Sequence, residues 1–578
     1  MARIAGTKRT EGLMRRLSVV AAIVAIGTAF LGWQPAAAAP NLANIDTVVV
    51  IYLENWSFDG LFARFPGANG ISRATPAQWT QRDRDGSVLF GLPPVFGGMN
   101  SGVATGAQQA PVNLTQAQTA AYLGTFNHPY TYSALWQSTG FLINNAPLQY
   151  TTRDMYHRFY ENQMQINGGK NDMFAAWADS GGLVMAYHDH TNADQPLWNI
   201  AQRFTLADNF FQSAFGGSYL NHQFLICSCA PVYPNVAGVP TNPNTGGSAP
   251  APSQVQADGI TLKTTASSPA SALNGPPQFV ASTTVTPTAP FYTINTMQPP
   301  YVPSGNGVLV NGVQTSVNQL SASTTPPQTL TTIGDLLDQA GVNYAWYSGG
   351  MGDANTAGTA MTLAPFTDQP GTNVPHYQYH HNPFNYYIKF DPAAQYNPAT
   401  GLPDNTVAPG AYRAAHLKDG GLGGSKFLAD VAAGTLPPVT FYKPHGTVNE
   451  HPGYANVSDG DRHIAAVVAA LQHSPQWRHM LIVITYDEFG GQWDHVAPPK
   501  GDMFGPGTRI PAIIISPYAK EHFVDHTQYD TASVLRFITR RWNLPVLPGL
   551  RVRDEALVRN GFPPMGDLTH ALDLDERR

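Results

Sequence analysis

Residues 479–499, HMLIVITYDEFGGQWDHVAPP, decide the fold. The apolar, β-branched run MLIVIT is typical of a strand that is buried on both faces of a parallel sheet. The run leads into Asp487 and Glu488 and, a little later, Asp494 and His495. Open α/β sheets bind ligands at the carboxyl ends of their strands, and a divalent cation relieves the repulsion between adjacent carboxylates. The stretch therefore predicts a metal site at a strand end, with a plain acidic turn as the alternative.

The composition limits the class of protein. The chain has 578 residues, of which 43% are hydrophobic, so it can bury a large core. Only 12% of the residues are charged, and 54 Gly and 48 Pro indicate many irregular connections. The net charge of -6 provides no basic field, so nucleic acid is not an expected partner. Cys227 and Cys229 form either two buried thiols or one tight local disulfide, and no disulfide framework.

The amino terminus has the pattern of an export signal, residues 1–39. Basic residues precede an apolar stretch at 17–33, and small residues at 36–39 offer cleavage sites. Residues 15–20, RRLSVV, also fit a twin-arginine signal. A membrane anchor is disfavoured because the apolar run is short and interrupted by Gly. We therefore expect a periplasmic or secreted protein without a stable membrane span after cleavage.

A second buried strand is predicted at residues 45–53, IDTVVVIYL. It ends in Glu54 and Asn55, which repeats the arrangement at Asp487 and Glu488: a carboxylate at the carboxyl end of a buried strand. One such strand end is as compatible with a turn as with a site. Two in one chain favour a site.

Two further stretches carry side chains suited to phosphoryl chemistry. Residues 156–176 predict a helix that carries His157 and is broken near residues 167–169, although a lone helical histidine is usually a surface or core residue. Ser218 follows two glycines at the start of a helix-like stretch, where backbone N–H groups and the helix dipole suit a nucleophile that attacks phosphorus. A helix N-cap serine is the alternative.

The rest of the chain predicts the α/β class. Residues 331–349 and 461–486 predict helix-then-strand units, residues 509–518 a further buried strand, and residues 531–542 a helix. This alternation predicts a mainly parallel central sheet with helices on both faces. We expect a single domain over residues 40–578. A Pro-, Ser- and Thr-rich insertion at about 236–328 is expected to contain a small β region.

Several separated motifs together resemble the bacterial acid phosphatase and phospholipase C superfamily. They are ENWSFD at 54–59, NGGK at 167–170, DNFF at 208–211 leading to GGS at 216–218, and YDE at 486–488 leading to WDHV at 493–496. The resemblance covers nearly all of the chain after the signal. It implies an alkaline-phosphatase-like α/β fold and hydrolysis of phosphoric esters. The form GGSxxNH at 216–222 is more similar to the acid phosphatase branch.

The resemblance also implies roles for individual residues. One divalent metal ion, of open identity, would be held by Glu54, Asn55, Asp487 and Glu488, with Ser218 as the metal-bound nucleophile. The stretch HHNPFNY at 380–386 resembles the family's phosphate-binding histidines, and His451 matches a further catalytic histidine. His157, His380, His381 and His451 would then contact the phosphoryl group, with one of them protonating the leaving alcohol.

The chain departs from the family pattern at two positions. Trp56 stands where the family usually has Arg, which removes a cation and leaves the charge preference for substrates open. Glu488 stands where acid phosphatases have a second Asp, so its reach is longer by one methylene and the metal identity stays open.

The predicted function is a secreted or periplasmic acid phosphatase that acts on phosphate monoesters. The nearer alternative is a phospholipase C acting on phosphatidylcholine-type lipids, in which Trp56, Tyr379 and Tyr387 would surround a quaternary ammonium group. The more distant alternative is an exported protein that binds phosphate or metal without turnover. The presence of Glu54, Ser218 and Asp487 disfavours it.

Overall fold

The computed structural model describes most of the chain after the predicted signal. The described residues are 41–100, 113–140, 147–189, 195–231, 255–280, 309–310, 313–314, 328–356 and 376–574. The predicted export signal at 1–39 lies outside them and stays a prediction. Within the described residues, no helix combines the length and the apolar character needed to cross a bilayer.

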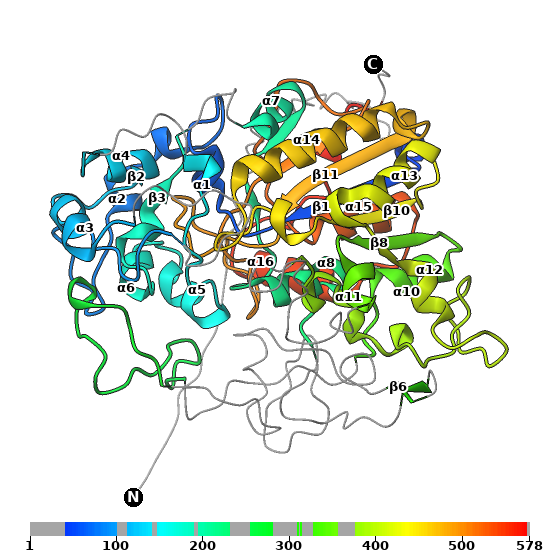
Figure 1. The fold of residues 1–578 in the computed structure, drawn as a ribbon, viewed down its shortest axis with the longest axis horizontal. Coiled ribbons are helices and arrows are strands. Elements are labelled where there is room, and N and C mark those ends of the chain that lie inside the picture. Colours follow the sequence, from blue (N-terminus) through cyan, green and yellow to red (C-terminus); the bar gives the residue numbers. More distant parts are fainter. Residues whose placement is uncertain are drawn as a thin grey trace, which may run out of the picture. The chain divides into compact units, whose positions relative to one another are not determined.

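The central element is an eight-stranded sheet in the order β13-β4-β12-β11-β1-β10-β8-β9. Its central strands β11, β1, β10 and β8 are labelled in Figure 1. Its strands are β1 Thr47–Leu53, β4 Thr205–Ala207, β8 Tyr344–Ser348, β9 Leu417–Asp419, β10 Val439–Lys443, β11 Met480–Tyr486, β12 Ala512–Ile515 and β13 Phe523–Asp525. Only β12 runs antiparallel to its neighbours, β11 and β4. Every residue of β1 and β11 is buried, which explains their unbroken apolar sequences. The predicted mainly parallel α/β sheet is confirmed.

Helices and loops cover both faces of the sheet. Trp346 and Tyr347 are adjacent on β8 and therefore point to opposite faces. Trp346 lies 6.2 Å from His222 of α8, and Tyr347 lies 5.2 Å from Phe427 of α13, as ring centroids. The described helices are α1 Phe58–Phe62, α2 Pro76–Trp79, α3 Gln116–Leu123, α4 Tyr132–Gln137, α5 Phe159–Ile166, α6 Phe174–Trp177, α7 Pro196–Arg203, α8 Ser218–Cys227, α10 Ile333–Gln339, α11 Met351–Thr356, α12 Ala411–His416, α13 Ser425–Ala433, α14 Val457–His473, α15 Ser533–Arg541 and α16 Pro548–Arg559.

The register of the central strands brings distant sequence motifs together. β1 and β11 are parallel, and Leu53 pairs with Tyr486, so Glu54 and Asp487 leave the sheet side by side. β10 lies on the other side of β1 and ends at Lys443. Three neighbouring strands therefore deliver polar side chains to one edge of the sheet.

One sequence prediction is wrong at its beginning. The helix expected over residues 156–176 starts only at Phe159, so His157 lies in the preceding loop. The reason is a tertiary contact, because this segment packs so closely on Gly216 that a Cβ there would come within 2.2 Å of the Phe159 nitrogen. The predicted break is confirmed, since α5 ends at Ile166 and Asn167 adopts a left-handed conformation with φ 46°.

Short strand pairs lie outside the main sheet. They are β2 Tyr130–Thr131 with β3 Ala186–Tyr187, β5 Phe210–Phe211 with β14 Tyr529–Asp530, and β6 Leu309–Val310 with β7 Val313–Gln314. The last pair falls in the predicted insertion at 236–328, most of which is outside the described residues, so its boundaries stay a prediction. Cys227 and Cys229 form a disulfide, which decides between the two alternatives that the sequence left open.

Candidate metal centre and active site

Glu54 and Asn55 follow β1 directly and are completely buried. Asn55 has φ 62°, a left-handed conformation that is uncommon outside glycine and typical of strained functional positions. Its backbone N–H donates to Asp487 Oδ1 at 3.1 Å, which fastens the end of β1 to the end of β11. The predicted pairing of these two strand ends in space is observed.

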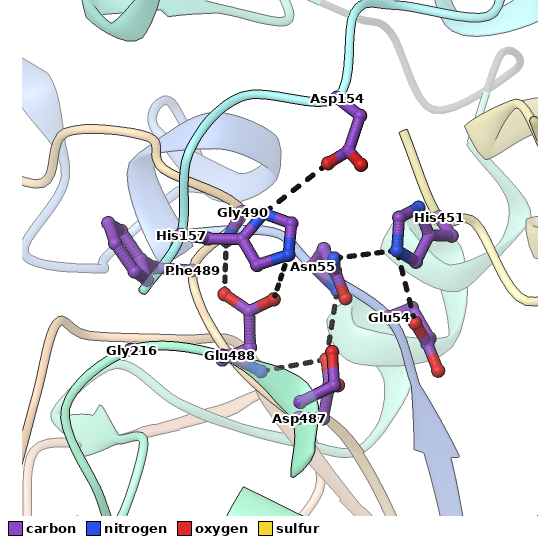
Figure 2. Close-up of polar contacts among 12 residues, drawn as sticks. Glu54, Asn55, Asp154, His157, Gly216, His451, Asp487, Glu488, Phe489 and Gly490 are labelled. Carbon is purple, nitrogen blue, oxygen red and sulfur yellow. Dashed lines mark hydrogen bonds and ion pairs between the residues drawn. The ribbon is translucent and has the colours of Figure 1, made fainter. Parts of the chain in front are cut away.

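Backbone N–H groups also fix the carboxylates after β11 (Figure 2). Asp487 Oδ1 accepts a second hydrogen bond from the Glu488 N–H at 2.8 Å, and Glu488 Oε2 accepts one from the Gly490 N–H at 2.7 Å. Gly490 has φ 62°, and a Cβ at this position would lie 2.3 Å from the Asn55 carbonyl oxygen. The glycine therefore permits the close approach of the two loops that carry the acidic groups.

The carboxylates perturb one another because all of them are buried. Burial, followed by the charge of Glu54, raises the pKa of Asp487 to about 7. Burial and Asp487 raise the pKa of Glu488 well above its ordinary value. Burial alone would also raise the pKa of Glu54, but His381 and Lys443 hold it well below the ordinary value. Burial and mutual repulsion therefore oppose full ionisation of the cluster, and a bound cation would favour the ionised forms of Asp487 and Glu488.

Lys443 is a site residue that the sequence analysis missed. Its Nζ lies 2.6 Å from Glu54 Oε1, and both side chains are completely buried. Lys443 is the last residue of β10, so it lies at a strand end as Glu54 and Asp487 do, but this position alone does not show that its side chain is buried. A single lysine after a strand normally indicates a solvated turn, and that explains why it was passed over.

Three histidines surround the acidic cluster on its buried side. His381 Nε2 lies 2.7 Å from Glu54 Oε1, and its ring lies 4.6 Å from that of His380. His222, one turn after Ser218 on α8, lies with its Nδ1 3.8 Å from Asp487 Oδ2 and was also missed as a site residue. Burial lowers the pKa of all three imidazoles, so they are neutral hydrogen-bonding groups at neutral pH.

The other two histidines line the open side of the site. The side chains of His157 and His451 are 20% and 10% exposed, and their rings lie 6.1 Å apart. His157 Nε2 is 3.7 Å from Glu488 Oε1, and its Nδ1 is 3.3 Å from Asp154, a residue that the sequence analysis did not single out. These two imidazoles can exchange protons with solvent, which the three buried ones cannot do readily.

Ser218 is the first residue of the ten-residue helix α8. Its side chain is close enough to the Asp487 carboxylate to lower the pKa of Asp487, against the larger effect of burial. A Cβ at Gly217 would lie 2.8 Å from the His157 carbonyl oxygen, so the small residue lets the His157 loop cross close to the serine. Ser218 therefore joins the two strand-end motifs and the His157 loop in one site.

The donor set fits a divalent cation. Asn55 Nδ2 lies 3.0 Å from His451 Nε2, an arrangement that turns Asn55 Oδ1 towards the cluster. Among the described residues, neither Asn55 Oδ1 nor Glu488 Oε1 has a hydrogen-bond donor. Glu54 Oε1 is already paired with Lys443 and His381, which leaves Oε2 as its free ligand atom. Buried carboxyl and amide oxygens without partners are the kind of ligand that hard divalent cations prefer.

Asp494 and His495 do not join this site. Both belong to a separate buried network in which Arg509 Nε donates to Asp494 Oδ1 at 3.0 Å. His495 Nδ1 lies 2.6 Å from Asp59 Oδ2, and Arg509 Nη2 donates to the other oxygen of Asp59 at 3.1 Å. The second half of the 479–499 stretch therefore has a structural function.

The chain is similar to a known protein family and to several individual proteins. The description "Phosphoesterase family" applies to a family model that matches residues 45–545. "Phospholipase C B" of Mycobacterium tuberculosis is 31% identical over 173 residues, which cover 26% of this chain and 32% of that protein. "Non-hemolytic phospholipase C" of Burkholderia pseudomallei is 28% identical over 237 residues, with 36% and 31% covered. The chain thus spans about a third of the length of these curated relatives.

One solved structure with detectable similarity is a protein in the alkaline phosphatase superfamily from Vibrio parahaemolyticus. It is 10% identical, has a TM-score of 0.29, and the similarity covers 65% of this chain and 64% of that one.

Proposed function

Because this chain belongs to the Phosphoesterase family, we propose that it is a metal-dependent acid phosphatase that hydrolyses phosphate monoesters through Ser218. The observation that carries the proposal is the position of Ser218. Its side chain adjoins the Asp487 carboxylate, at the N-terminal turn of α8, beside acidic and amide oxygens that have no hydrogen-bond partner among the described residues. A nucleophile at a helix start, next to cation ligands, suits attack on a phosphoryl group.

Glu54, Asn55, Asp487 and Glu488 would hold the metal ion, with Ser218 adjoining. When bound, such an ion neutralises phosphoryl oxygens and favours the ionised form of a neighbouring hydroxyl. The Asp487 carboxylate adjoins the Ser218 side chain and can orient its hydroxyl for attack. Attack of its oxygen on phosphorus forms the serine–phosphate bond and breaks the bond to the leaving alcohol. Water then hydrolyses the phosphoserine and releases phosphate.

The five histidines divide into two groups by burial. His222, His380 and His381 are buried and neutral, and can donate hydrogen bonds to phosphoryl oxygens without carrying charge. His157 and His451 keep contact with solvent, so they are the candidates for giving a proton to the leaving alcohol and regaining it from water. We assign the acid role to His451, because its Nε2 also lies 3.6 Å from Glu54 Oε2 at the centre of the site.

The experiment that tests the proposal is Ser218→Ala. The variant should fold with an unchanged unfolding transition and lose more than about tenfold of monoester turnover, since the nucleophilic step is lost. Ser474→Ala is the matched control, because Ser474 is also buried but lies after the end of α14 and donates to the Val431 carbonyl. Retained turnover in Ser218→Ala would mean that water attacks phosphorus directly, and the covalent route would be wrong.

A phospholipase C is the second candidate, because the curated relatives carry that name. The aromatic residues expected to surround a quaternary ammonium do not support it. Trp56, Tyr379 and Tyr387 are at most 4% exposed, and Trp56 Nε1 donates to the Glu450 carbonyl at 2.9 Å. Turnover of p-nitrophenyl phosphate and of phosphatidylcholine vesicles, measured side by side, separates the two activities.

We also propose that the protein acts in the periplasm or outside the cell, on the basis of the signal pattern in residues 1–39. Amino-terminal sequencing of the protein recovered from culture medium and periplasm tests this. A mature terminus close to residue 40 is expected, and a terminus at Met1 in the cell fraction alone would contradict it.

A further inference from the structure

Three consecutive residues, Asn449 to His451, contact three consecutive residues of the metal-site loop. The Glu54 N–H donates to the Asn449 carbonyl at 3.0 Å, and the Trp56 indole donates to the Glu450 carbonyl at 2.9 Å. Between them, the Asn55 side chain contacts His451 at 3.0 Å. The backbone at Glu450 therefore determines how Glu54, Asn55 and His451, the residue proposed to protonate the leaving alcohol, lie relative to one another.

Glu450 holds this position in an unfavourable backbone conformation, with φ 73°. A non-glycine residue in the left-handed region persists only where its surroundings determine it, and its cost is on the order of 1 kcal/mol or more. The side chain shows what those surroundings are. Tyr486 OH donates to Glu450 Oε2 at 2.6 Å, and Tyr486 immediately precedes Asp487. Glu450 thus connects the loop after β10 to the last residue of β11.

The other partner of Glu450 is a second carboxyl group. Asp461 lies on α14 and is completely buried, and its carboxyl group interacts with that of Glu450 although neither of its oxygens has a donor among the described residues. The approach of α14 is close: a Cβ at Gly460 would lie 2.2 Å from Glu450 Cγ. Glu450 Oε1 has no donor from any other described residue. Two carboxyl groups in contact, both at 0% exposure, form a hydrogen bond only when a proton lies between them.

We propose that Glu450 and Asp461 share one proton and that this carboxyl pair is the positioning element that sets the geometry of Asn55 and His451. The inference rests on the proposed function, since it concerns how that site is held in place. Neither residue touches the cluster of metal ligands. Both act through the loop that carries His451 and through Tyr486.

The charges around the pair are consistent with a retained proton. Burial raises the pKa of Glu450 to about 8, against the hydrogen bonds from Tyr486 and Asp461. Burial and Glu450 raise the pKa of Asp461 well above its ordinary value, and neither the Leu197 backbone nor Arg462 outweighs them. Both shifts favour the protonated form, so the pair retains a proton at neutral pH.

A conservative and a disruptive substitution of Glu450 separate this role from simple packing. In Glu450→Gln, the amide oxygen accepts from Tyr486 and the amide nitrogen donates to the Asp461 carboxylate, so every hydrogen bond is kept without the shared proton. In Glu450→Met, a side chain of similar length keeps the packing and loses both bonds. Asp461→Asn is the reciprocal conservative variant.

The primary measurement is Mn²⁺ affinity by calorimetry, without substrate. Glu450→Gln and Asp461→Asn should remain within about threefold of wild type, whereas Glu450→Met should weaken binding by about 10- to 100-fold, the usual loss when support of metal ligands is removed. Glu555→Met is the control for replacing a glutamate by methionine, because Glu555 forms an exposed ion pair on α16. Equal losses in Glu450→Gln and Glu450→Met, or wild-type affinity in a folded Glu450→Met, would overturn the proposal.

A spectroscopic measurement keeps the test open if Glu450→Met does not fold. The infrared difference spectrum of Mn²⁺-loaded wild type minus Glu450→Gln at pH 7 should contain one protonated-carboxyl band, and so should the difference against Asp461→Asn. No band in either difference would exclude the shared proton. Neither Mn²⁺ affinity nor the infrared difference spectrum requires turnover. If the proposed function is wrong, wild type will lack monoester turnover, and this outcome is distinct from both readouts.

Discussion

Lys443→Met should destabilise the protein more than any substitution of a surface lysine, and added metal should reduce the deficit. Lys443 Nζ lies 2.6 Å from Glu54 Oε1 with both side chains fully buried. Removing one partner of a buried ion pair leaves an uncompensated charge and costs about 3–5 kcal/mol. His381 contacts the same oxygen at 2.7 Å and can take up a proton, which brings the expected loss to about 3 kcal/mol.

The assay is urea unfolding of metal-free and metal-saturated protein. Loss of the Lys443 cation favours binding of a metal cation beside Glu54. At saturating metal, each tenfold gain in metal affinity reduces the loss of unfolding free energy by about 1.4 kcal/mol. Lys426→Met is the matched control: Lys426 lies 2.5 Å from Asp419, but its side chain is 66% exposed. Such a surface pair contributes about 1 kcal/mol or less. Equal losses in the two variants, or a Lys443→Met deficit that metal leaves unchanged, would refute the electrostatic account of the site.

Three further predictions concern single groups. Asp487→Asn should lose metal and monoester turnover together, because an amide is a weaker ligand for a hard cation; full metal content in the folded variant would exclude Asp487 as a ligand. His451→Ala should slow hydrolysis of an alkyl phosphate far more than that of p-nitrophenyl phosphate, whose leaving group needs little protonation, and equal slowing would exclude the acid role. Burial lowers the pKa of His445 to about 3 and of His463 to about 4. Below about pH 6.5 the unfolded chain therefore binds more protons than the folded chain, so the free energy of unfolding should fall as pH drops from about 6.5 towards 4. His445→Gln should reduce the slope of free energy against pH, and an unchanged slope would contradict the prediction.

The sequence predicts the strand-end residues well, because the signal for them is local. An unbroken apolar run indicates a buried strand, and the next polar residues must then lie at the carboxyl edge of the sheet. Glu54, Asn55, Asp487 and Glu488 follow from this rule and lie together in the structure. Antiparallel β12 shows the limit of the rule, since an apolar run does not encode the direction in which a buried strand enters the sheet.

The residues that the sequence misjudged are those whose environment is set by tertiary contacts. His157 lies in a loop because the segment from His157 to Phe159 packs against Gly216 and Gly217, about 60 residues later in the chain, where a side chain would not fit. Lys443 has no local feature that separates a buried partner of Glu54 from a solvated lysine. Glu450 is similar, because only the approach of Asp461 shows that its side chain is enclosed.

Two acidic clusters adjoin the same stretch of sequence, and their hydrogen bonds distinguish a structural cluster from a candidate ligand site. Asp59 and Asp494 are paired with Arg509 and His495, so their carboxyl groups have partners within the chain and have little to gain from a cation. The cluster of Glu54, Asp487 and Glu488 has one buried cation, Lys443, and keeps oxygens without donors among the described residues. A folded chain retains such oxygens only at a free-energy cost. Because the first cluster shows that this chain can pair buried carboxylates with its own side chains, the incomplete pairing of the second is the feature that supports our proposal of a binding site there.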